Sequence, residues 1–154
     1  MKLYRLYRRQ RLKVTPGDAW GFFADPRNLE RITPPWLGFE ILGGADEPMY
    51  AGQIISYRIK PLPFLRLGWV TEITQVDEPR FFVDQQRLGP YRLWHHQHRF
   101  TAVDGGMEME DTVHYALPGG PLGRLAHRMD IERRLRAIFD FRWQAVERRF
   151  GALA

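Results

Sequence analysis

The sequence contains no cysteine. This absence excludes disulfide bonds, thiolate metal sites and cysteine nucleophiles, and it is typical of proteins that work in a reducing compartment. Serine is almost as scarce, because Ser56 is the only one, and no G-x-S-x-G motif is present. These two observations argue against a serine hydrolase, so any reaction chemistry must come from other side chains.

Long hydrophobic runs are also missing. No window approaches the ~20 apolar residues that a membrane-spanning helix needs. The opening residues, MKLYRLYRRQRLKV, lack the apolar core of a signal peptide. We therefore expect a cytoplasmic protein without integral membrane association.

Lysine is rare among the basic residues. Lys2, Lys13 and Lys60 are the only lysines among 23 basic side chains, and the net charge is +5. A basic balance can indicate nucleic acid or an anionic membrane as a partner. Here the arginines are spread along the chain, and in the C-terminal segment they alternate with acidic residues, which is typical of a solvated, ion-paired helix face. We expect no nucleic-acid partner.

The length and the aromatic content describe an ordinary globular chain with many rings. At 154 residues, the chain has the size of one domain, and we expect a single domain over residues 1–154. Aromatic residues make up 14% of the chain. That many rings can fill a core or line an apolar cavity, and composition alone does not separate the two.

Local patterns predict an α+β protein. Residues 2–14 alternate as a half-buried strand does, and Thr15 with Pro16 and then Asp25 with Pro26 are typical starts of two short helices. Six strand-like segments separated by turn residues follow, at 37–42, 52–60, 67–76, 80–88, 91–103 and 107–117. From Pro121 to Phe150, apolar residues recur at helical spacing. We expect one long amphipathic helix that packs on a curved antiparallel sheet.

Three segments carry a family resemblance: NLERITPPWLGFEI (28–41), FVDQQRLGPYRLWHHQHRF (82–100) and MEDTVHYALPGGPLGRL (109–125). They resemble signature segments of a bacterial stand-alone subfamily of the SRPBCC superfamily, related to the N-terminal domain of some epimerase-like fusion proteins. The superfamily includes START lipid-transfer domains, birch-pollen-allergen-like proteins and polyketide cyclases. The resemblance implies a helix-grip fold: a seven-stranded curved antiparallel sheet, two short helices after the first strand, and a long C-terminal helix across the sheet. It also implies a hydrophobic cavity between sheet and helix.

The stretch GPYRLWHHQHRF (89–100) contains the densest group of polar and aromatic side chains. On a strand, alternate residues share a face, so Trp94 and Phe100 mark the buried face and place His96 and His98 on it. The same alternation on neighbouring strands brings further side chains to this face. The candidate ligand-binding residues are Tyr57, Trp69, Asp84, Gln86, Trp94, His96, His98, Phe100, Asp111 and Tyr115.

Three interpretations of this group remain open. Asp84 and Asp111 could each pair with a histidine, which would satisfy buried polar groups without any function. The same groups could orient a mostly apolar ligand in a pocket. His96, His98 and Asp84 could also form an open metal site, although H-x-H spacing alone is weak evidence for one.

We therefore expect binding of a hydrophobic small molecule, such as a lipid or a polyketide-like compound. The alternative is a cyclase-like, aromatase-like or metal-dependent enzyme that uses His96, His98 and Asp84. A second alternative is a protein-interaction module with a filled core. No catalytic residue is assigned, no cofactor and no metal are expected, and a homodimer is left open.

Overall fold

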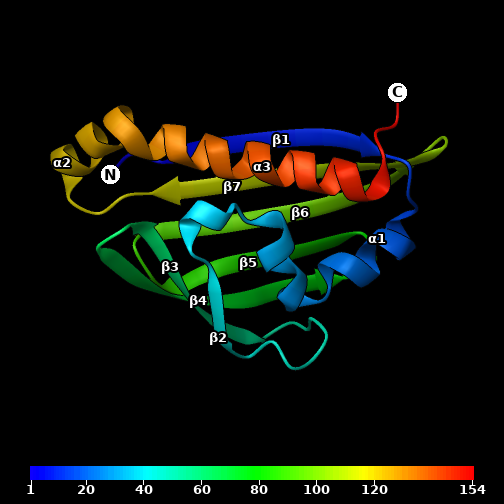
Figure 1. Cartoon of the computed structure of the whole chain (residues 1–154), viewed down its shortest axis with the longest axis horizontal. Helices are drawn as coiled ribbons and strands as arrows, with labels where there is room; N and C mark the ends of the chain where they lie inside the picture. Colours follow the sequence, from blue (N-terminus) through cyan, green and yellow to red (C-terminus); the bar gives the residue numbers. More distant parts are fainter.

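The seven predicted strands form one antiparallel sheet, as a computed structural model of residues 1–154 shows. The strand order is β1-β7-β6-β5-β4-β3-β2, so the chain runs as a meander except that the first strand pairs with the last (Figure 1). The strands are β1 (Tyr4–Leu12), β2 (Glu40–Gly43), β3 (Ile54–Leu62), β4 (Leu65–Asp77), β5 (Phe81–Leu88), β6 (Leu93–Val103) and β7 (Gly106–Ala116).

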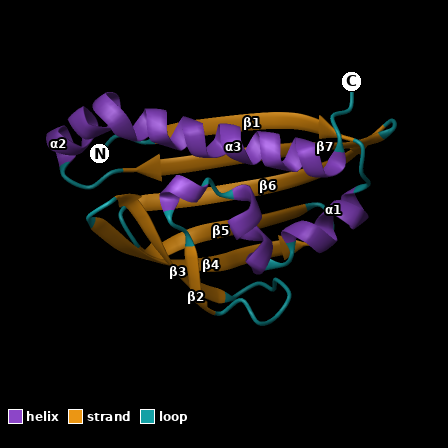
Figure 2. Ribbon diagram, in the orientation of Figure 1, coloured by secondary structure: helices purple, strands orange, loops and turns teal.

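The helices lie over one face of this sheet, as Figure 2 shows. They are α1 (Pro16–Phe23), the 3-10 helices η1 (Pro26–Ile32) and η2 (Pro35–Leu37), α2 (Gly120–Ala126), the π-helical turn η3 (His127–Ile131) and α3 (Glu132–Phe150). This is the predicted α+β helix-grip fold, with α3 running along β1 and β7 in Figure 1. None of the helices is both long and apolar enough to cross a membrane.

The two predicted helix starts are confirmed. The Thr15 hydroxyl accepts a hydrogen bond from the Asp18 backbone N–H, and Pro16 occupies the first turn of α1. The Asp25 carboxylate accepts from the Arg27 backbone N–H at the start of η1. The second element is a 3-10 helix, and the additional short helix η2 delays the start of the next strand from the predicted residue 37 to Glu40.

The predicted strand faces are confirmed wherever pairing is regular. Along β6 and β7, every second side chain from Trp94 to Phe100 and from Met107 to Tyr115 is buried. In β4, the register with β5 shifts between Ile73 and Gln75, and the next apolar side chain that packs inward is Val76. A β-bulge therefore reverses the alternation at this point.

The long C-terminal helix departs from the prediction in its first third. Leu122, Leu125 and Met129 were expected in the apolar stripe that covers the sheet, but they are exposed. The π-helical turn at His127–Ile131 separates α2 from α3 and changes the angular register of their side chains. The stripe of α3, including Leu135, faces the sheet, together with His127 and Ile131 of η3.

The largest buried cluster fills one end of the molecule. It joins β1, α1, β6 and β7 to the end of α3, where Val146 is fully buried. Trp20 packs edge-to-face on Phe82 and Phe100 at centroid distances of 5.9 and 6.1 Å. This packed end anchors α3 on the sheet.

The Thr15 cap can be tested by mutation. Thr15→Ala is expected to lower the free energy of unfolding by about 1 kcal/mol, because the Asp18 backbone N–H in the first turn of α1 loses its acceptor. Thr15→Ser keeps the hydroxyl and is the matched control. Urea denaturation measures both variants, and an equal loss in the two would contradict the capping role.

Candidate functional site

A cavity of about 520 Å³ lies between the sheet, helix α3 and the 3-10 helices η1 and η2. Of the 37 residues that line it, 24 are hydrophobic, so its interior suits an apolar ligand. Trp36 and Leu65 belong to the wall and are 47% and 36% exposed. The cavity therefore reaches the protein surface.

Three large rings form one side of the cavity. Trp94 packs against Trp69 and Tyr91 at centroid distances of 5.2 and 4.9 Å, and all three residues line the cavity. The indole N–H of Trp69 donates to the Thr71 hydroxyl at 3.0 Å. This bond and the mutual ring contacts fix the orientation of the aromatic wall.

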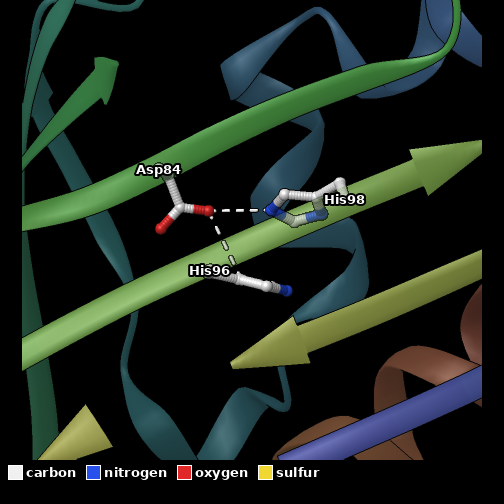
Figure 3. A group of neighbouring side chains, drawn as sticks. All are labelled: Asp84, His96 and His98. Atoms are coloured by element: carbon white, nitrogen blue, oxygen red, sulfur yellow. Dashed lines mark hydrogen bonds and ion pairs between the residues drawn. The ribbon is translucent and has the colours of Figure 1, made fainter. Parts of the chain in front are cut away.

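The polar group predicted from the histidine strand is a closed network of two imidazoles and two carboxylates. His96 Nε2 lies 2.8 Å from Asp111 Oδ1, and His98 Nε2 lies 2.8 Å from Asp84 Oδ2. The other ring nitrogens also face carboxylates, with His96 Nδ1 3.3 Å from Asp84 and His98 Nδ1 3.2 Å from Asp111. Figure 3 shows the Asp84 carboxylate beside the two imidazoles, with one oxygen directed at both. The predicted mutual network is confirmed.

Strand register produces this arrangement. Asp84 on β5 lies opposite His96 on β6, and Asp111 on β7 lies opposite His98. The two imidazole rings lie 3.7 Å apart between centroids, because residues two apart on one strand share a face. Each carboxylate therefore reaches both rings. We call Asp84, His96, His98 and Asp111 the His–Asp network.

The network holds its charges in place. Burial alone would raise the pKa of Asp84 and Asp111, but their contacts with His96 and His98 hold both pKa values well below the usual range. Burial alone would lower the pKa of His96, but Asp84 and Asp111 raise it. The ionised carboxylates and the protonated form of His96 stabilise each other.

Six of the ten predicted ligand-binding residues line the cavity: Tyr57, Trp69, Asp84, Trp94, His96 and His98. Burial, and then the Asp84 charge, raises the pKa of the Tyr57 hydroxyl, so Tyr57 stays a neutral hydrogen-bonding group. The six come from β3, β4, β5 and β6. They place apolar rings and the His–Asp network on one continuous surface.

The other four predicted residues lie outside the cavity wall, although their side chains alternate as expected. Asp111 is buried beneath the two histidines, and Phe100 belongs to the packed end of the molecule. The side-chain amide of Gln86 donates to the Tyr91 carbonyl oxygen and accepts from the Tyr91 backbone N–H. These two hydrogen bonds hold the connection between β5 and β6 in place. Tyr115 lies 2.7 Å from His127 Nε2 through its hydroxyl. Each of the four has a structural partner instead of a position on the cavity.

The sequence patterns assigned no role to Arg142, which lines the cavity, or to His127, which lies outside its wall. His127 had no predicted partner, yet it contacts Tyr115 and stacks on Tyr4 at 3.6 Å, and burial lowers its pKa. Arg142 lines the cavity from α3. A signal for Arg142 was present, because Leu135, Phe139, Arg142 and Val146 follow helical spacing, so one arginine falls within the apolar stripe.

The ligand atoms of Asp84, His96 and His98 lie within 4.8 Å of one another, which is close enough to hold a metal ion. Two imidazoles and a carboxylate are a donor set that suits zinc or iron. The same nitrogens already contact carboxylate oxygens, so an ion would have to replace these pairs. The donor set fits a metal, and one of its buried nitrogens, His98 Nδ1, has no hydrogen-bond partner in the protein.

The meander, the long helix across it and the cavity between them define a helix-grip protein. The family model described as "Polyketide cyclase / dehydrase and lipid transport" matches residues 5–151. The chain therefore belongs to this family, which lies within the SRPBCC superfamily. No curated protein matches the chain.

Solved structures share the fold at low sequence identity. Ara h 8.0201 is 17% identical with a TM-score of 0.64, and the match covers 94% of this chain and 98% of that one. A point mutant of norcoclaurine synthase from Thalictrum flavum, solved with a transition-state analogue, is 13% identical with a TM-score of 0.63, covering 96% and 97%. An uncharacterized protein from Rhizobium leguminosarum is 13% identical with a TM-score of 0.67, covering 96% of each chain. These likenesses concern the fold.

The His–Asp network predicts how stability depends on pH. Because the folded-state pKa of His96 is raised, its contribution is fully present below the unfolded value of about 6.5 and is lost as pH rises through the folded-state value. The folded-state pKa values of His95 and His127 are lowered, so these two are already neutral above pH 7. We expect the free energy of unfolding to fall between pH 7 and 9, measured by urea denaturation.

His96→Gln is the comparison variant. It keeps a polar side chain but has no group that titrates in this range, so its stability is expected to vary less with pH between 7 and 9. Parallel profiles for the two proteins would contradict the raised pKa of His96.

Proposed function

We propose that this protein binds a hydrophobic small molecule in the cavity between the sheet and α3. The observation that carries the proposal is the cavity itself, at about 520 Å³ with a mostly hydrophobic wall. Ligand pockets are commonly about 300–1,000 Å³, so the space suits a lipid or a polyketide-like compound. A chain whose apolar side chains simply filled its core would not leave such a volume.

The distribution of polar groups supports a ligand with a defined orientation. Asp84, His96 and His98 lie in the same wall as the aromatic residues Trp69 and Trp94. An apolar body can lie against the rings while a polar end faces the network. The family description, which names both cyclases and lipid transport, and the ligand complex of norcoclaurine synthase support the same use of the fold.

Native mass spectrometry of the purified protein is the direct test. An organic mass bound one-to-one, identified after denaturation of the same sample, would name the ligand class. Metal analysis of the sample runs alongside, and stoichiometric zinc or iron would favour the metal-dependent alternative instead.

A substitution that fills the cavity tests where the ligand binds. Ile138 lies on α3 in the cavity wall, so Ile138→Trp adds a ring to the space. We expect the affinity for N-phenyl-1-naphthylamine, a neutral apolar fluorophore, to fall about tenfold or more, because overpacking costs about 1–3 kcal/mol. Fluorescence titration measures the change.

Gln144→Trp is the matched control, because residue 144 lies on the exposed face of the same helix. Its affinity for the fluorophore is expected to equal that of the unmodified protein. Equal affinities for all three proteins would place the binding elsewhere and contradict the proposal.

A second candidate function is proton transfer to or from a bound substrate. It is favoured by the position of His96 and His98 in the cavity wall, each oriented by a carboxylate. If a ligand recovered from the protein is turned over, His96→Gln or His98→Gln is expected to lower the rate by about 10²–10⁴-fold and to remove a limb of the pH–rate profile. A profile that survives loss of both histidines would exclude this candidate.

A further inference from the structure

Arg142 carries a buried positive charge that the protein does not neutralise with a hydrogen bond. Its side chain is 11% exposed, and its Nε and Nη1 are fully buried with no acceptor of the protein in hydrogen-bonding position. Burying a charged group without partners costs several kcal/mol, so such groups are rare in protein interiors. Because protein atoms cover Nε and Nη1, a molecule in the cavity that Arg142 lines would reach the guanidinium at Nη2.

Three other arginines of α3 have carboxylate partners. Arg133 and Arg134 pair with Asp130, and Arg136 pairs with Glu132. The acid nearest to Arg142 is Asp111, whose Oδ1 lies 3.7 Å from Nη1, too far for a hydrogen bond. That same oxygen contacts His96 at 2.8 Å and His98 at 3.2 Å. Asp111 Oδ1 therefore hydrogen-bonds His96 and forms no hydrogen bond with Arg142.

The surroundings hold the guanidinium in place without satisfying its donors. It lies 5.3 Å from the centroid of the Phe139 ring, one turn earlier on α3. A ring face attracts a cation but accepts no strong hydrogen bond. The three carboxylates of the cavity wall have other partners: Asp84 pairs with His96 and His98, Asp25 with Arg27, and Asp130 with Arg133 and Arg134. The unmet requirement at this point of the wall is a negatively charged acceptor.

We infer that the ligand of this cavity is an amphiphile with a carboxylate head group that binds Arg142. A carboxylate oxygen can accept a charge-assisted hydrogen bond from Nη2, and such a bond gains strength in a dry site. The apolar body of the ligand then lies against Trp69, Trp94 and Ile138. This inference rests on the proposed function, because it names the ligand class of the same cavity.

Three probes with one tail and different heads test the inference: decanoate, decan-1-ol and decylamine. Displacement of N-phenyl-1-naphthylamine from the unmodified protein measures their affinities at pH 7.5. Charge-assisted hydrogen bonds contribute enough to expect decanoate to bind about 10- to 100-fold more tightly than decan-1-ol, with decylamine the weakest. This comparison requires no mutation, so it does not depend on the folding of a variant.

Arg142→Met removes the charge and keeps an unbranched apolar side chain. The preference for decanoate over decan-1-ol is expected to disappear, whereas the affinity for decan-1-ol is retained. Arg148→Met is the control, because residue 148 lies on the same helix but is exposed, and it should keep the full preference. Thermal unfolding establishes that both variants are folded.

The outcomes separate this inference from the proposed function. Equal binding of decanoate and decan-1-ol, or a preference that survives Arg142→Met, would overturn the carboxylate assignment while cavity binding stands. Failure of the fluorophore and all three probes to bind would overturn both. A preference that is present in the unmodified protein and in Arg148→Met, and lost in Arg142→Met, would support the inference.

Discussion

The packing of the end of α3 against the sheet is the interaction on which the rest of the structure depends. Val146 and Leu12 are fully buried, together with Met107 from the neighbouring strand. Large rings from α1 and β6 fill the same end, so α3 is held firmly there. Toward its beginning the helix spans the sheet without filling the space beneath it, and the cavity occupies that space. The close packing at this end stabilises the fold enough for a chain of this size to keep a cavity at the other end.

The pairing of the polar groups beside the cavity is explained by the free-energy cost of burying an unpaired charge. Two aspartates and two histidines lie in an environment where an unpaired charge would be strongly destabilising. The antiparallel register places each carboxylate opposite an imidazole, and each carboxylate hydrogen-bonds one of the two histidines. Three buried nitrogens of this region have no hydrogen-bond partner in the protein: His98 Nδ1 and the Nε and Nη1 of Arg142. A buried cation without hydrogen bonds lowers the stability of the folded chain, and such a departure is expected at a binding site.

Most of the fold could be predicted from the sequence because its signals are local. Thr15 before Pro16 marks a helix start whatever surrounds it, and Asp104 before Gly105 marks the two-residue turn between β6 and β7. Alternation along 91–103 predicted that His96 and His98 face inward, and pairing with Asp84 and Asp111 was one of the three interpretations that it left open. It could not predict the bulge after Ile73, because a single extra residue leaves no mark in composition.

The sequence by itself determined the order of the elements, the buried face of each regular strand and the chemical content of the His–Asp network. Periodicity and capping act over a few residues, and both are readable without coordinates. Only the tertiary structure decided which inward side chains line the cavity and which are covered. Phe100 and Tyr115 alternate just as Trp94 does, yet packing partners from α1 and η3 cover them. Helical spacing places Arg142 on the apolar side of α3, but only the tertiary structure decided that it lies at the cavity wall, because the position of the helix on the sheet depends on how distant segments pack.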